Sequence, residues 1–183
     1  MREPAFIAGR NKALLTGIGL NSLGDMLPEQ VGKPWRDLKA YVEARRAEAL
    51  AEARLAIRLL VEGYTRNAAG KAFQSFKSLL AALAGERREE LRDKVKNIDR
   101  VIAYMPTSMI REVGKLLGLE REAAIALALH QYQYNGADPE GVMSIYTSRA
   151  EAVKDICALL NSVAEVLSDE SLKQELNNAC GSV

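Results

Sequence analysis

Apolar residues in the first half of the chain recur at alternating steps of four and three, and this spacing constrains the fold more than any other feature. Side chains at such steps lie on one face of an α-helix, which can then pack against a neighbouring helix. We therefore expect a helix that has Thr65 as its N-cap and ends at Gly85. Its stripe consists of Ala69, Phe73, Phe76, Leu80 and Leu83.

The segments before and after this one carry the same signal. Pro34 near a helix start and Gly63 at its end bound a long amphipathic helix, which is predicted to form an antiparallel hairpin with its successor. Residues 86–105 predict a third helix, which Pro106 ends. The two stripes consist of Leu50, Ala53, Ile57 and Leu60, and of Leu91, Val95, Ile98, Ile102 and Met105.

The second half of the chain predicts further helices. Residues 107–117 form a shorter one, and the helix after Glu120 is so apolar over residues 123–129 that we expect it to be the most buried in the chain. Ser148 lies three residues before Glu151, the spacing of a capping box, and should begin another helix.

Together these segments predict an all-α fold, an antiparallel up-and-down helix bundle over residues 34–183. The first 33 residues are rich in glycine, carry Pro4 and Pro28, and are expected to form an N-terminal arm or short helices. Apolar residues make up 48% of the chain, which is enough for a substantial core.

The charge balance and the cysteines limit the partners and the compartment. With 25 basic and 24 acidic side chains the formal charge is +1, so any RNA contact must come from a local patch. No stretch approaches the roughly 20 apolar residues that cross a bilayer, so a cytoplasmic protein without a membrane partner is expected. Cys157 and Cys180 lack C-x-x-C spacing, and we expect free buried thiols rather than a disulfide.

Several kinds of site are not supported by the motifs. The stretch GYTRNAAGK, residues 63–71, has six residues between its glycines and no hydroxyl after the lysine, so it is not a phosphate-binding P-loop. The GIG at residues 17–19 follows no predicted strand, as a dinucleotide-binding loop would. One histidine and two distant cysteines do not form a zinc set, so no metal and no cofactor are expected.

The stretch LHQYQYNGADPEG, residues 129–141, holds the only histidine and has two interpretations. In the structural one, residues 130–134 are the last turn of a helix, Asn135 or Gly136 ends it in the left-handed conformation, and residues 138–141 form a type I turn. His130 near a helix C-terminus then has a modest stabilising role.

In the functional interpretation, the same stretch supplies chemistry. His130 and Tyr132 present an acid/base group and a phenol within one turn of helix, and they are the candidate catalytic residues. Tyr132 and Tyr134 are also able to stack on nucleic-acid bases. The candidate binding residues are Arg66, Lys71, Tyr134 and Asn135.

The predicted hairpin ARLAIRLLVEGYTRNAAGKAFQSFKSLLAALA and the later LHQYQY resemble the HEPN superfamily of small helical bundles, and particularly its archaeal PaREP-type branch. This resemblance covers residues 45–167. HEPN ribonucleases carry an arginine, four to six residues, a histidine, one residue and a tyrosine. His130 and Tyr132 match the second half, but residues 123–125 are Ala, Ala and Ile where the arginine belongs.

The resemblance implies a small homodimeric bundle, and the missing arginine divides the functional hypotheses. RNA cleavage by 2′-hydroxyl attack needs a cation at the phosphate, and Arg121 lies nine residues before His130, on the opposite side of the helix. We expect a module that acts by dimerisation and by binding a protein, nucleotide or RNA partner. The alternative is a metal-independent, toxin-like ribonuclease that uses His130, with Arg66, Lys71 or a residue across a dimer interface supplying the charge.

Overall fold

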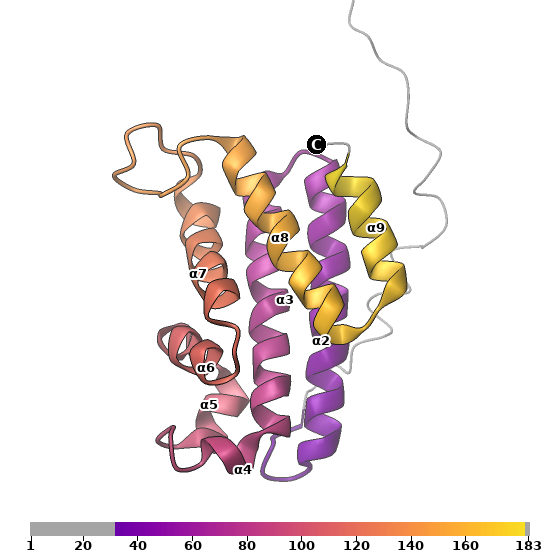
Figure 1. The fold of residues 1–183 in the computed structure, drawn as a ribbon, viewed down its shortest axis with the longest axis vertical. Coiled ribbons are helices and arrows are strands. Elements are labelled where there is room, and N and C mark those ends of the chain that lie inside the picture. The colour runs from indigo at the N-terminus through magenta and orange to yellow at the C-terminus, as the bar shows by residue number, and fades with distance from the viewer. Residues whose placement is uncertain (1–31, 182–183) are drawn as a thin grey trace, which may run out of the picture.

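The computed structural model describes residues 32–181, and these residues form helices and connecting turns without a strand, which confirms the all-α class (Figure 1). The expected arm at residues 1–33 lies almost entirely outside the described residues. The helices are α2 (Leu38–Val61), α3 (Thr65–Glu86), α4 (Arg88–Leu91), α5 (Ile98–Tyr104), the 3₁₀-helix η1 (Thr107–Met109), α6 (Ile110–Leu116), α7 (Glu120–Asn135), α8 (Arg149–Leu167) and α9 (Glu170–Cys180).

Helix α2 begins at Leu38, shortly after Pro34. Asp37 is its N-cap, and the Asp37 carboxylate accepts a hydrogen bond from the backbone amide of Ala40 at 2.9 Å. Pro34 lies in the turn directly before the helix, near its start as expected, and the Asp37 cap, which satisfies a free amide, fixes the first turn. The expected end is confirmed: Gly63 has a φ of +88° in the turn that leads to α3.

Helix α3 is the central element, since it packs against α2, α5, α7 and α8 (Figure 1). Phe73 and Phe76 are each 1% exposed on its buried face. Gly85 is not a helix stop but a buried helical residue, and a Cβ there would come 2.8 Å from Cγ2 of Val42. Thr65 is the first helical residue rather than the N-cap, and no side chain caps this helix.

Residues 86–105 do not form the single helix that their apolar spacing predicted. The chain breaks between α4 and α5 at Asn97, which has a left-handed backbone with φ 57° and ψ 42°. The Arg88 guanidinium donates to both carboxylate oxygens of Asp99, at 2.6 and 3.0 Å. Eleven residues of straight helix would span roughly 16 Å, so this ion pair requires the bend.

Helix α7 packs on α3 and α6 and is less buried than expected. Its fully covered residues are Ala123, Ala126, Leu129 and Tyr132. Ala124 is exposed within the apolar run, so the expectation that this is the most buried helix is wrong. Residues 123–129 are apolar on all sides of α7, and this pattern suggested complete burial. The helix that has neighbours on most of its sides is α3.

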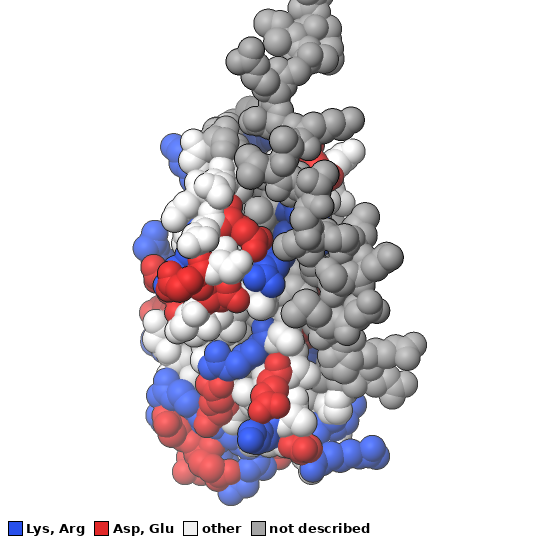
Figure 2. Space-filling view, turned by 90° about the vertical axis from the view of Figure 1, so that its right-hand side faces the viewer, with Lys and Arg blue, Asp and Glu red and all other residues white. Residues whose placement is uncertain are grey.

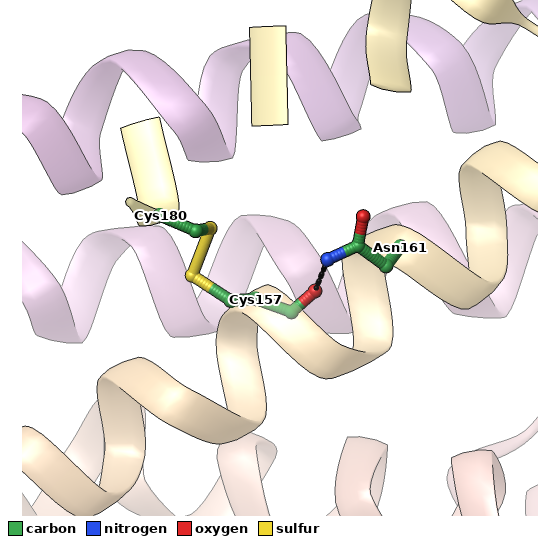
Figure 3. The surroundings of a disulfide bond; sticks show 3 residues. All are labelled: Cys157, Asn161 and Cys180. Atoms are coloured by element: carbon green, nitrogen blue, oxygen red, sulfur yellow. Dashed lines mark hydrogen bonds between the residues drawn. A yellow bond between two sulfur atoms is a disulfide. The ribbon is translucent and has the colours of Figure 1, made fainter. Parts of the chain in front are cut away.

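The C-terminal pair α8 and α9 contains the expected capping box and an unexpected disulfide. The Ser148 hydroxyl accepts from the amide of Glu151, and the Glu151 carboxylate accepts from the amide of Ser148. Cys157 of α8 and Cys180 of α9 are bonded, with their Cα atoms 6.1 Å apart (Figure 3). The expectation of free thiols is therefore wrong, because the α8–α9 hairpin brings together cysteines that are 23 residues apart in the chain.

The described surface carries mixed charge. On the face shown in Figure 2, basic and acidic side chains alternate rather than forming one continuous basic area. None of the described helices combines the length and apolarity that a membrane span needs.

Candidate functional site

The imidazole of His130 lies on the face of α7 that meets α3. It is half-buried, stacks on the ring of Phe73, and meets the Tyr134 ring edge-on at 5.4 Å. Its Nδ1 lies 2.6 Å from the side-chain nitrogen of Gln133. Burial lowers the pKa of His130, and the nearby Lys77 lowers it further. The ring of the candidate base therefore packs against Phe73 and Tyr134, and its Nδ1 contacts the Gln133 side chain.

Tyr132 lies on the other side of α7. It is 3% exposed and its ring meets that of Tyr146 edge-on, with centroids 5.4 Å apart. Residues two apart in a helix differ by about 200° in direction. The structure therefore gives His130 and Tyr132 different neighbours and does not bring them together as a pair.

Arg66 and Tyr134 do come together, where the first turn of α3 meets the last turn of α7. Arg66 Nε donates to the carbonyl of Gln133 at 3.0 Å, and Nη2 donates to the carbonyl of Tyr134. Carbonyls in the last turn of a helix lack partners within it, so Arg66 caps α7. Beside these contacts is a surface depression of about 270 Å³ lined by Arg66, Asn67, Gln133 and Tyr134. We call it the α3–α7 depression.

The two other candidate binding residues have structural partners. Lys71 pairs with Glu52 of α2 at 2.9 Å. The Asn135 side-chain nitrogen donates to the carbonyl of Met143 at 2.6 Å and ties the end of α7 to the following loop. Neither residue lines the α3–α7 depression.

The loop between α7 and α8 contains the predicted turn. Gly136 ends α7 with φ 74° and ψ −162°, so the positive φ is confirmed, although this ψ is not that of the left-handed helix region. The amide of Gly141 donates to the carbonyl of Asp138 at 3.0 Å and closes the turn at residues 138–141. Backbone amides, the strongest contribution being from Met143, lower the pKa of Asp138.

This loop also exposes large apolar side chains. Val142, Met143 and Ile145 are 76%, 59% and 67% exposed. The signal was present in the sequence as GVMSIY, a run of large apolar residues directly after a turn. Large exposed apolar side chains that lie close together are typical of an interaction surface.

Comparison with known protein families identifies the family of this chain. A family model described as the Archaeal PaREP1/PaREP8 family matches residues 44–157. The chain belongs to this family. No curated protein and no solved structure matches it.

The PaREP1/PaREP8 match covers most of α2, all helices from α3 to α7, and α8 as far as Cys157. The matched residues therefore include His130, Tyr132 and the α3–α7 depression, whereas α9 lies beyond them. Within residues 32–181, no group of three or more histidine, cysteine or acidic side chains is arranged to hold a metal ion.

The PaREP1/PaREP8 chain has a second depression, of about 280 Å³, at the α4–α5 bend. Basic side chains of Arg92, Lys96 and Arg100 line it together with Asp99. Asp99 is already paired with Arg88. No aromatic side chain lines this second depression, so it offers no ring on which a base can stack.

Proposed function

We propose that this PaREP1/PaREP8 chain is a HEPN-like helical module that acts by dimerising and by binding a nucleotide or RNA partner. The observation that carries the proposal is the meeting of Arg66 and Tyr134 at the α3–α7 depression. The Tyr134 side chain is 67% exposed and offers a ring face on which a base can stack. Arg66 supplies positive charge next to it.

The contacts of His130 favour binding over catalysis. Nδ1 of His130 faces the Gln133 amide and the ring stacks on Phe73, so Nε2 is the nitrogen left for a general base. Tyr132 is turned towards Tyr146. The ribonuclease alternative therefore has no assembled pair of catalytic groups to support it.

Dimerisation is supported by the exposed apolar side chains of the α7–α8 loop. A second copy of the chain would cover Val142, Met143 and Ile145, which a monomer leaves in water. Light scattering at micromolar concentration should give about twice the monomer mass of 20.0 kDa. A mass near 20.0 kDa would contradict the dimer.

A cytoplasmic location remains part of the proposal. Disulfides are rare in most cytosolic proteins, but the intracellular proteins of hyperthermophilic archaea are a known exception. The Cys157–Cys180 bond in a chain of an archaeal family is compatible with that exception.

Fluorescence anisotropy with a short labelled single-stranded RNA tests the binding proposal. Arg66→Gln and Tyr134→Ala should each weaken binding about tenfold, since stacking and phosphate contacts are each worth about 1–3 kcal/mol. The matched control is Arg121→Gln, an exposed arginine in the first turn of α7 that does not line the depression. Equal binding by all variants, or capture of a protein partner alone, would contradict the proposal.

Turnover assays provide a second test of the same proposal. If the folded protein cleaves RNA or a nucleotide and the His130→Ala variant does not, the binding proposal is wrong and the ribonuclease alternative is supported.

A further inference from the structure

The step from Asn135 to Gly136 joins the last residue of α7 to its C-cap. Asn135 is the one asparagine of the chain that glycine follows. In such a step the backbone nitrogen of the glycine is able to attack the side-chain carbonyl carbon of the asparagine and close a succinimide ring. Glycine hinders this closure least, because it has no side chain. Asn135 is also exposed, so water can reach the ring and open it.

The α7–α8 loop holds the side-chain amide of Asn135. The amide nitrogen donates to the carbonyl of Met143 at 2.6 Å. This bond fixes the direction of the amide group, and the nitrogen that it holds is the one that must leave in the reaction. Attack on the amide carbon therefore requires that this hydrogen bond first breaks.

The attacking nitrogen is occupied as well. The backbone amide of Gly136 donates to the carbonyl of Tyr132 at 2.7 Å, in the last turn of α7. An amide in such a bond points back along the helix axis to the preceding turn, not towards the neighbouring side chain. The fold therefore keeps both reacting groups of the step in hydrogen bonds of their own.

The α7–α8 loop that holds Asn135 is built around the carboxylate of Asp138. This carboxylate accepts the backbone amides of residues 140, 142 and 143, at 3.0, 2.8 and 2.6 Å. The amide of Asp138 in turn donates to the carbonyl of Tyr146 at 2.8 Å. These bonds fix the segment that presents the Met143 carbonyl to the end of α7, so the hold on Asn135 depends on the Asp138 carboxylate.

We propose that Asn135 is a deamidation site that the fold protects, and that its conversion releases the α7–α8 loop from α7. In the reaction, the nitrogen of Gly136 bonds to Cγ of Asn135, and its proton leaves with the side-chain nitrogen as ammonia. Water then opens the succinimide to aspartate or isoaspartate, and no other reactant is needed. The site is independent of the proposed binding of a nucleotide or RNA.

The deamidated product lacks the donor that ties the loop to α7. A carboxylate at position 135 has no hydrogen to donate to the Met143 carbonyl, and the oxygens of the two groups repel each other. The new negative charge also lies in the last turn of α7, where the helix dipole disfavours it. We therefore expect the loop, which projects beyond α7 and α8 in Figure 1, to separate from the end of α7.

Peptide mapping by mass spectrometry, after incubation of the full chain in mildly alkaline buffer, tests the protection. Deamidation of Asn135 should be at least about tenfold faster in guanidinium chloride than in native buffer, because two hydrogen bonds no longer hold the reacting groups. Asn161 is the internal control, since its side-chain nitrogen also donates to a carbonyl, that of Cys157 at 2.9 Å, but Ser162 follows it. Asn161 should react more slowly than Asn135 in the denaturant. Equal rates for Asn135 in the native and unfolded chains would overturn the proposal.

Two loop variants test where the protection comes from. Asp138→Ala removes the acceptor of three loop amides and should make native deamidation of Asn135 about tenfold faster. Glu140→Ala is the matched control, because it removes an exposed carboxylate from the same loop, and it should react like the wild type. If Asp138→Ala keeps its helical circular dichroism and still deamidates as slowly as the wild type, the loop does not protect Asn135.

Hydrogen exchange on Asn135→Asp, which mimics the aspartate product, tests the release of the loop. The amides of Gly136, Val142 and Met143 should exchange at least about tenfold faster than in the wild type. Asn161→Asp is the control, since it makes the same change in α8, and it should leave these amides unchanged. Wild-type exchange at all three amides of Asn135→Asp would overturn the release.

Discussion

The imidazole of His130 stacks on the phenyl ring of Phe73, with the ring centroids 4.1 Å apart and the planes inclined by 22°. This contact joins α7 to the central helix α3. We expect His130→Gln to lower the free energy of unfolding by about 1 kcal/mol, the usual size of an aromatic pair interaction. The melting temperature should fall by about 2–4 °C.

The matched control for this prediction is Gln131→Ala, which changes the exposed next residue of α7 and should melt like the wild type. An unchanged melting temperature for His130→Gln would remove the structural interpretation of the histidine and favour a search for its substrate.

The same histidine should make stability depend on pH. Its folded-state pKa is lowered by burial and by Lys77 from the ordinary 6.5, so the folded protein favours the neutral ring. Its contribution is complete above the unfolded-state pKa and is lost as the pH falls through the folded-state pKa, because the unfolded chain takes up the proton first. Urea unfolding between pH 7.5 and about 5 should show this loss in the wild type. The loss should be smaller in His130→Gln, and parallel curves would contradict the assignment.

Helices with one broad buried face were predictable from the sequence, and the bend between α4 and α5 was not. The spacing of Leu91, Val95 and Ile98 describes burial correctly, since all three are buried. The spacing cannot show that Asn97 adopts a left-handed backbone or that Arg88 pairs with Asp99. These features depend on local conformation and on charge, not on the spacing of apolar residues.

The candidate site was predictable only in part, for a related reason. Helix geometry alone places His130 and Tyr132 on different sides of α7. Arg66 and Tyr134 lie 68 residues apart in the chain, so no local pattern connects them. The packing of α3 against α7 creates this juxtaposition.

Gly136 provides a test of the helix end that the sequence predicted. Its φ of 74° is a conformation that a β-branched side chain resists, so Gly136→Val should cost about 1–2 kcal/mol of stability. A Cβ at this position would lie in ordinary contact, 3.6 Å from the nearest atom, Cδ of Arg66, so the first side-chain carbon does not clash. Gly32→Val is the control, because Gly32 has no atom within 4 Å and no positive φ. Equal chemical denaturation of the two variants would contradict the backbone explanation.

Tyr146 provides a test of a buried polar contact that the sequence did not indicate. Its hydroxyl donates to the Asp155 carboxylate at 2.8 Å, and the residue is 3% exposed. Tyr146→Phe should lower stability by about 1–3 kcal/mol, because a charged acceptor loses its donor. Tyr134→Phe removes the same atom from a side chain that is 67% exposed and should be neutral. Similar urea midpoints for both variants would show that the Tyr146–Asp155 bond contributes nothing.

The disulfide between Cys157 and Cys180 should stabilise the chain mainly by closing a loop of 23 residues in the unfolded state (Figure 3). A loop of that length corresponds to about 3 kcal/mol in the chain-entropy account. Reduction should therefore lower the melting temperature without unfolding α9, because Leu172 and Leu176 remain buried and Arg54 still pairs with Glu175 at 3.2 Å. Melting curves with and without a phosphine reductant measure the shift. The variant with both Cys157→Ser and Cys180→Ser is the control, since it should melt at the lower temperature under both conditions. If the melting temperature of the wild type does not change on reduction, although its thiols become accessible to alkylation, the packing of α9 and not the disulfide provides this stability.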